Sequence, residues 1–131
     1  MGEPDQRGPV LAVVGPCAAG KTTLVLELSS RGCAAREVAQ EHSVVSDLWR
    51  RRGHEGPMVF LDVSPGVACK RRGITIVPSW WSAASSRLTV ARRDADLYLC
   101  TDQLSREQVL SRVLAYLDSL GWDRADPDGA G

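Results

Sequence analysis

Four short runs of apolar residues are separated along the chain by segments in which apolar residues recur every three or four positions. A continuous apolar run predicts a strand of a parallel sheet, because such a strand is buried on both faces. The runs lie at residues 10–14, 33–39, 58–63 and 95–101, and the second is the most polar of them. Parallel strands need long crossover connections, and the segments between the runs supply them.

These intervening segments predict helices. Two of them have clear starts, because Ser64 is followed by a first-turn proline and Ser105 forms a capping-box pattern with Gln108. Strands and helices in alternation predict an α/β fold of three layers, with a small parallel sheet of about four strands and helices on both faces. The expected helices span residues 21–30, 44–52, 65–72, 82–93 and 105–120, and residues 74–86 are the least regular stretch.

Length, charge and hydropathy limit what the chain does. Its 131 residues suffice for one domain, which we place at residues 10–121 between a flexible N-terminus of residues 1–9 and a flexible tail of residues 122–131. Sixteen basic and sixteen acidic residues give a formal net charge of zero, so we expect no nucleic-acid partner. The sequence contains neither an apolar run of membrane-spanning length nor the apolar core of a secretion signal. We therefore expect no membrane partner and a cytoplasmic location.

One stretch carries specific chemistry. It matches the phosphate-binding pattern GxxxxGK[ST] without a mismatch, and it lies between the first predicted strand and the first predicted helix, as that pattern requires. In this geometry backbone N–H groups and a helix N-terminus point at one place, where an anion binds. The residues concerned are Gly15, Pro16, Cys17, Ala18, Ala19, Gly20, Lys21, Thr22 and Thr23.

Two side chains of this stretch have expected roles in binding a nucleoside triphosphate, either ATP or GTP. Lys21 is expected to reach the β- and γ-phosphates, and the Thr22 hydroxyl is expected to ligate Mg²⁺. The chain contains fourteen arginines but only two lysines, Lys21 and Lys70. A lysine at position 21 is therefore informative, since a compact ammonium fits inside a loop of amides where a planar guanidinium does not.

Three further segments resemble the small P-loop kinases, the group that contains adenylate, thymidylate, cytidylate, shikimate and gluconate kinases. Residues 59–72 are similar to the strand and helix that lead into the lid of these enzymes, residues 87–93 to the returning helix of the lid, and residues 95–102 to the final strand and its turn. With the phosphate-binding stretch, these segments cover most of residues 10–120. The resemblance implies a P-loop NTPase fold and the transfer of a phosphoryl group from ATP to a small molecule.

The resemblance also implies roles for individual side chains. These kinases place arginines on the transferring phosphoryl group, and the corresponding candidates are Arg71, Arg87 and Arg92, which join Lys21 as catalytic residues. The other two candidates for contact with the nucleotide are Arg72, near the phosphates, and Asp102, in the turn that often borders the adenine.

The sequence departs from these kinases in its middle part. Only about fifteen residues separate His42 from Met58, which leaves room for one helix and no further strand, so the acceptor-binding region is expected to be shortened or absent. Asp62 ends an apolar strand and is either a metal ligand alongside Thr22 or a hydrogen-bonding group at the sheet edge. Ala18 replaces a glycine that is common in the loops of these enzymes, and the replacement is tolerated if its φ is negative.

The end of the second predicted strand supplies side chains to the expected acceptor site. Glu37, Glu41 and His42 fall on the same edge of the sheet as the phosphate-binding stretch, because consecutive parallel strands point the same way. Glu41 is the candidate for a general base or for a ligand of a Mg²⁺-bound water. His42 is expected to be a surface residue.

Three functions are compatible with these features. The first is an ATP-dependent kinase that phosphorylates an unknown small molecule or nucleotide, and the arginines of the lid-like segment favour it. The second is a nucleotide-binding module, a slow NTPase or a regulatory partner without an acceptor site, and the short middle part favours it. The third, association with nucleic acid, is suggested only by local arginine clusters.

Trp80 and Trp81 lie within the segment that the resemblance makes a lid. They would serve as its apolar cover or stack on a base, or else one packs in the core while the other lies at the surface or in a dimer contact. The chain is accordingly expected to be a monomer or a homodimer.

Overall fold

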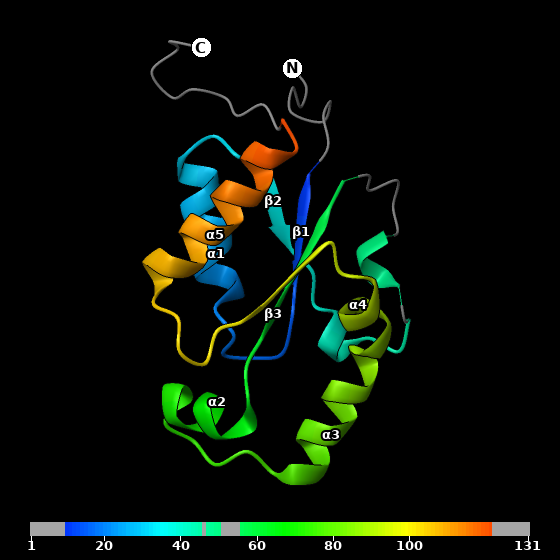
Figure 1. The fold of residues 1–131 in the computed structure, drawn as a ribbon. Coiled ribbons are helices and arrows are strands. Elements are labelled where there is room, and N and C mark those ends of the chain that lie inside the picture. The colour runs from blue at the N-terminus through cyan, green and yellow to red at the C-terminus, as the bar shows by residue number, and fades with distance from the viewer. Residues whose placement is uncertain (1–9, 46, 51–55, 122–131) are drawn as a thin grey trace, which may run out of the picture.

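A sheet of four parallel strands organises the chain (Figure 1). The computed structural model describes residues 10–45, 47–50 and 56–121. The order across the sheet is β2, β1, β3, β4, so the expected α/β fold with about four parallel strands is confirmed for these residues. The strands are β1 Leu11–Val14, β2 Ala35–Glu37, β3 Met58–Asp62 and β4 Leu97–Cys100.

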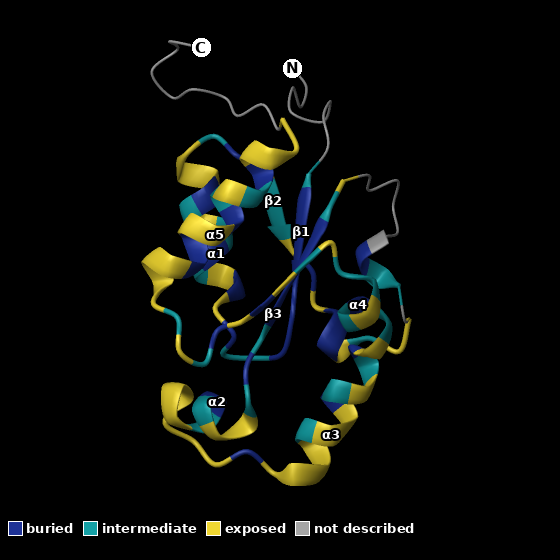
Figure 2. Cartoon of the chain, in the orientation of Figure 1, coloured by how far each residue is buried: buried dark blue, intermediate teal, exposed yellow. Residues whose placement is uncertain are grey.

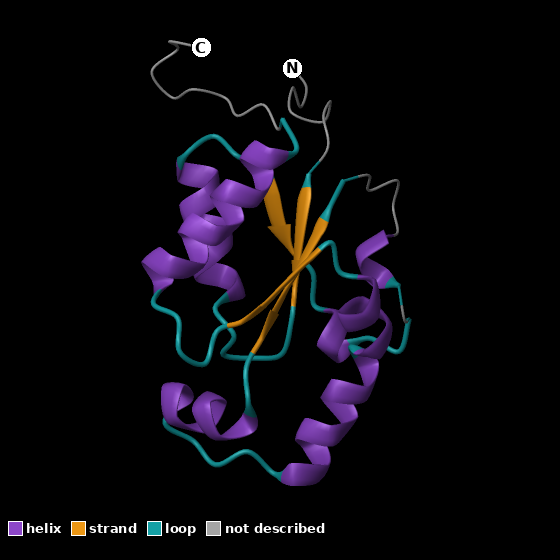
Figure 3. Cartoon of the chain, in the orientation of Figure 1, coloured by secondary structure: helices purple, strands orange, loops and turns teal. Residues whose placement is uncertain are grey.

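Helices lie on both faces of this sheet and beyond its carboxyl edge (Figure 1, Figure 3). On one face α1, Lys21–Ser30, packs against α5, Arg106–Ser119, and on the other lies α4, Thr89–Asp94. Beyond the carboxyl ends of the strands lie α2, Pro65–Arg72, and α3, Pro78–Arg87. Between β2 and β3 the described residues form two 3-10 turns, η2 Gln40–His42 and η3 Leu48–Arg50.

Two sequence signals for helix starts correspond to hydrogen bonds. The Ser64 hydroxyl accepts from the N–H of Val67 at the start of α2. Ser105 and Gln108 form a reciprocal capping box at the start of α5. Both helices therefore begin where the sequence predicts.

Alternate residues of the central strands enter two separate cores. Figure 2 shows that β1 is buried along its length. In β1, Leu11 and Val13 face the layer of α1 and α5, whereas Ala12 and Val14 face the opposite layer. Burial on both faces is the reason that these strands read as continuous apolar runs. The larger core includes Leu28, Leu61, Val113 and Leu117, and the smaller includes Trp49, Phe60, Leu88 and Ala91.

The prediction of a single helix at residues 82–93 is wrong in two respects, its first residue and its being one continuous helix. Helix α3 begins at Pro78, inside the stretch expected to be least regular, and a second helix, α4, follows after Leu88. Proline is well suited to the first turn of a helix, so Pro78 starts α3 rather than interrupting regular structure. Trp81 packs partly buried against the larger core, and Trp80 lies exposed.

The prediction of a helix at residues 44–52 is also wrong. Its described residues, 44–45 and 47–50, contain only the 3-10 turn Leu48–Arg50. A helix this short depends on tertiary packing, and Val44, with 88% of its surface exposed, contributes little. Residues 46 and 51–52 of that expected helix, the loop at 53–55, and the expected flexible ends at 1–9 and 122–131 lie outside the described residues.

Candidate functional site

The site begins with the glycine loop, residues 15–23, which connects β1 to the first turn of α1. Gly20 is the N-cap of α1 and has a φ of 101°, a left-handed conformation that glycine adopts without strain. No side chain caps this helix within the described residues. Its first N–H groups, which have no partner inside a helix, are therefore available to an anion, and the helix dipole favours a negative charge there.

Gly15 holds the glycine loop against β3. A Cβ at this position would lie 1.9 Å from the carbonyl oxygen of Leu61. A real side chain never approaches a backbone atom so closely, so only glycine fits. The close approach fixes the start of the loop on the carboxyl half of the neighbouring strand.

Lys21 folds back over this loop and is almost completely buried, with 5% of its surface exposed. Its Nζ donates to the carbonyl oxygens of Gly15 at 2.6 Å and Pro16 at 3.0 Å. It also forms an ion pair with Glu41, whose Oε2 lies 3.0 Å away. A buried ammonium needs such compensation, because removing a charge from water without a partner is costly.

Glu41 lies in η2, directly beyond the end of β2, and its side chain is 7% exposed. Its Oε1 is buried and has no hydrogen-bond partner among the described residues. The second contact of Oε2 is with Nε2 of His42, at 3.7 Å, and the imidazole of His42 is mostly exposed. The backbone carbonyl of Glu41 accepts from Nη1 of Arg87 at 3.2 Å, which ties this turn to α3.

Thr22 and Glu37 form the second polar contact of the site. The Thr22 hydroxyl donates to Oε1 of Glu37 at 2.7 Å. Glu37 ends β2, and β2 pairs directly with β1, so its carboxylate lies beside the start of α1. A hydroxyl and a carboxylate are the hard oxygen donors that suit Mg²⁺.

The described residues contain no group of three His, Cys, Asp or Glu side chains arranged to hold a metal. A site for Mg²⁺ does not require one, because this ion usually keeps several waters and is bound by one or two carboxylates together with substrate phosphates. The pair formed by Thr22 and Glu37 fits that description.

These groups surround one open cavity of about 310 Å³, which we call the loop cavity. Arg72 reaches it from α2, and its expected contact with phosphates stays a prediction. The remaining lining residues come from the glycine loop and the end of β2: Cys17, Ala18, Gly20, Lys21, Thr22, Thr23, Glu37, Glu41 and His42.

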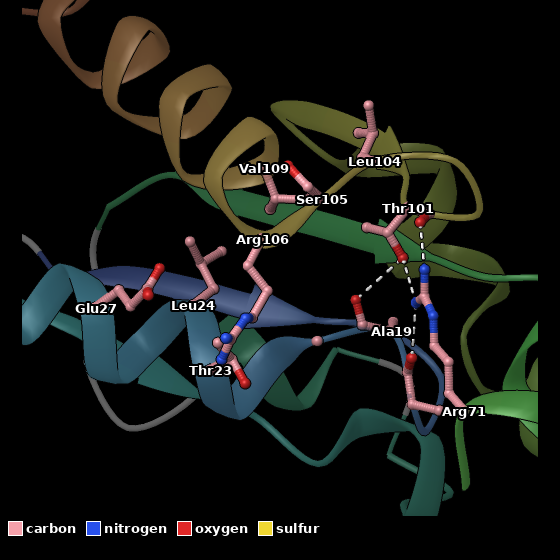
Figure 4. Close-up of a pocket in the computed structure, with 12 residues that line it drawn as sticks. Ala19, Thr23, Leu24, Glu27, Arg71, Thr101, Leu104, Ser105, Arg106 and Val109 are labelled. Carbon is pink, nitrogen blue, oxygen red and sulfur yellow. Dashed lines mark hydrogen bonds between the residues drawn. The ribbon is translucent and has the colours of Figure 1, made fainter. Parts of the chain in front are cut away.

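A second cavity, of about 370 Å³, adjoins the loop cavity and is called here the β4–α5 pocket (Figure 4). The two cavities share Ala18, Gly20 and Thr23. Apolar side chains of Leu24, Leu104 and Val109 contribute to its wall. Its polar lining residues are Glu27, Arg71, Thr101, Ser105 and Arg106.

Arg71 joins the glycine loop to the end of β4 (Figure 4). Its Nη1 donates to the carbonyl oxygen of Ala18 and to Oγ1 of Thr101, both at 3.0 Å, and its Nη2 donates to the carbonyl oxygen of Thr101. The carboxylate of Asp102 accepts from the N–H of Ser64 at 2.9 Å, at the N-cap of α2. Arg71 therefore braces the wall of the β4–α5 pocket, whereas Asp102 is not among the described residues that line the two cavities, and its expected contact with the nucleotide stays a prediction.

Asp62 and Arg92 belong to a different cluster. Oδ2 of Asp62 accepts from Nε of Arg92 at 3.2 Å and from the Tyr98 hydroxyl at 2.7 Å. Partial burial of the phenol, followed by its hydrogen bond to Asp62, raises the pKa of Tyr98 to about 12. The Arg92 guanidinium also lies 4.9 Å from the centre of the Phe60 ring. Neither Asp62 nor Arg92 is among the described residues that line the two cavities, and their expected roles stay predictions.

No protein-family model matches this chain, and a comparison with curated proteins finds no match. Its function is therefore inferred from the residues of the two cavities. In the described part of the chain, no helix has the length and apolar character needed to cross a membrane.

Sequence reasoning placed Glu37 near the site but missed its hydrogen bond to Thr22. That contact requires β2 to lie directly beside β1. One signal for this pairing was present, because the short segment before Met58 leaves no strand to separate β2 from β1. Thr101, which accepts from Arg71 and donates to the Ala19 carbonyl, carries no comparable signal.

Proposed function

We propose that this chain has a P-loop NTPase fold and binds a nucleoside triphosphate, ATP or GTP, with its phosphates in the loop cavity. The observation that carries the proposal is the position of Lys21, whose ammonium lies inside the glycine loop at the uncapped N-terminus of α1. Backbone N–H groups, the helix dipole and this ammonium together favour a polyphosphate.

The β4–α5 pocket offers a place for the base and sugar. It shares Ala18, Gly20 and Thr23 with the loop cavity. A mostly apolar lining with a few polar groups is typical of sites that bind small molecules and cofactors. A nucleotide spanning the two cavities would contact residues on both sides of the glycine loop.

Thr22 and Glu37 are the residues that would hold Mg²⁺ in this arrangement. The ion supplies neutralisation of negative charge on the phosphates when it is bound. The chain itself contributes the carboxylate and the hydroxyl, already 2.7 Å apart.

The reaction that we propose is kinase-like transfer of the γ-phosphoryl group to a small acceptor. Arg72 is the arginine that lines the loop cavity, whereas Arg71 and Arg87 contact backbone carbonyls and position the walls. The second candidate is a nucleotide-binding module with slow hydrolysis. The observation in its favour is that the described residues between β2 and β3 form only short 3-10 turns, which leaves little chain to bind an acceptor.

The test removes the ammonium. Lys21→Ala is expected to weaken MgATP or MgGTP binding at least about 100-fold in calorimetry, because a charge-assisted contact in a buried site is lost. Lys70→Ala is the matched control, since Lys70 is the other lysine of the chain and its side chain is exposed on α2. Equal affinity of the Lys21→Ala variant and the unmodified chain would show that the glycine loop does not bind the phosphates.

A further inference from the structure

Glu41 is buried and paired, yet one of its oxygens is unused. Oε2 is bound to Lys21, whereas Oε1 has no hydrogen-bond partner among the described residues. A buried acceptor without a donor destabilises the protein, so a ligand that brings a donor to it is favoured. Because Glu41 lines the loop cavity, that donor is expected to belong to a molecule bound there.

We propose that Glu41 is a catalytic base which nucleotide binding makes available, and that the phosphoryl acceptor in the loop cavity is a hydroxyl, of water or of an alcohol. This proposal rests on the nucleotide binding proposed above. It assigns the acceptor chemistry, which the glycine loop by itself does not.

The dependence on nucleotide follows from the ion pair. In the free protein Lys21 Nζ is held by Glu41 and by two backbone carbonyls. A γ-phosphate carries more negative charge than one carboxylate, so it displaces Glu41 as the partner of the ammonium. Since both anions compete for the same nitrogen, the released carboxylate borders the γ-phosphate.

The proposed step is a displacement at phosphorus. The hydroxyl oxygen forms a bond to the γ-phosphorus, and the bond from that phosphorus to the β,γ-bridging oxygen breaks. The bridging oxygen keeps the electron pair and leaves with the nucleoside diphosphate, while the hydroxyl proton passes to Oε1 of Glu41. Water gives inorganic phosphate and an alcohol gives a phosphate monoester. Arg87 is a positioning residue here, because its bond to the Glu41 carbonyl holds η2 in place.

The experiment separates binding from turnover in the full chain. Glu41→Gln keeps the shape of the side chain and removes the base, and Glu107→Gln makes the same change at an exposed position on α5. Calorimetry with β,γ-imido analogues of ATP and GTP measures affinity. The release of ADP or GDP measures turnover, with water alone and with a panel of sugars and nucleosides. Thermal unfolding verifies that each variant folds.

The expected result is a split between the two measurements. Glu41→Gln is expected to bind the analogue at least as tightly as the unmodified chain, because the competitor for Lys21 has lost its charge. Its turnover is expected to fall about 100-fold or more, the usual contribution of a general base. Glu107→Gln is expected to change neither quantity.

Three other outcomes would contradict the role of Glu41, the acceptor assignment or nucleotide binding. Turnover of Glu41→Gln within threefold of the unmodified chain overturns the role of Glu41. If the chain binds nucleotide but releases no ADP or GDP with water or with any alcohol tested, the acceptor assignment is overturned and the proposal of nucleotide binding stands. No nucleotide binding by the unmodified chain overturns both proposals. If Glu41→Gln does not fold, Glu41→Asp replaces it, and unchanged turnover with the shortened carboxylate counts against the base.

Discussion

Ala18 shows how a single backbone angle changes the interpretation of the glycine loop. Its φ is 66°, the only left-handed value among the described residues other than glycine. The condition under which alanine is tolerated without strain, a negative φ, is therefore not met. A left-handed conformation costs an L-residue about 1–2 kcal/mol. Contacts such as the bond from Arg71 to the Ala18 carbonyl offset that strain.

Replacing Ala18 by glycine is expected to stabilise the free protein. Glycine relieves the left-handed strain and loses part of the gain through its greater chain entropy, so the free energy of unfolding should rise by about 0.5–1 kcal/mol. Urea unfolding measures the change. Ala19→Gly is the matched control, because Ala19 is buried and has no positive φ, and it should lower stability. A loss of stability in the Ala18→Gly variant would contradict the strain.

The sequence predicts the residues of the site unequally. Lys21 and Thr22 are identified by a motif whose spacing is local, so no tertiary information is needed to place them. Glu37 contacts Thr22 only because β2 is the neighbour of β1 in the sheet. Asp62 and Arg92 meet only because β3, α4 and β4 pack together. Contacts of this kind depend on packing between distant segments, which periodicity does not encode.

At the scale of elements, the glycine loop and β3 act as one unit. Gly15 allows the loop to lie on the Leu61 carbonyl. Gly15→Ala is expected to lower the free energy of unfolding by at least about 2 kcal/mol, because the added Cβ forces the loop and the strand apart. Chemical denaturation followed by circular dichroism provides the measurement.

Gly66→Ala makes the same substitution where nothing lies near the added Cβ, in helix α2. It should leave stability unchanged or slightly raised, since alanine favours a helix more than glycine does. If the two variants unfold at the same denaturant concentration, the close approach of the loop to β3 is not a determinant of the fold.

Elements with one dominant signal were predictable, and elements with competing signals were not. The strands β1 and β3 are continuous apolar runs, and α5 has both a capping box and an apolar face. Pro78 is compatible with either a helix start or a break, and only the packing of α3 against η2 distinguishes the two. The turn Leu48–Arg50 lacks the length at which an apolar stripe defines a helix.

At the scale of the whole molecule, the two cavities collect residues from most of the fold. The loop cavity uses α1, the end of β2, η2 and α2, and the β4–α5 pocket adds the turn after β4 and the start of α5. A ligand that fills both cavities therefore joins elements from separate layers.

Nucleotide is accordingly expected to stabilise the entire domain. At a free ligand concentration one hundred times the Kd, binding to the native state alone adds about 2.7 kcal/mol, which corresponds to a rise in Tm of roughly 10 °C for a domain of this size. Differential scanning calorimetry with MgATP and MgGTP measures the shift. Inorganic phosphate at equal ionic strength is the control for a salt effect. A shift that persists in Lys21→Ala would indicate binding elsewhere.

The short edge strand β2 gives the two halves of the site different stiffness. Lys21 and the glycine loop are anchored to β1 and β3, whose residues are almost all buried. Glu37 ends a strand of three residues with one neighbour and partial exposure, whereas Glu41 is buried beyond it in η2. Regions with fewer buried contacts open at lower free energy. The glycine loop is thus expected to open at a higher free energy than β2, so the edge of the site that carries Glu37 is expected to adjust more readily to a ligand than the edge that carries Lys21.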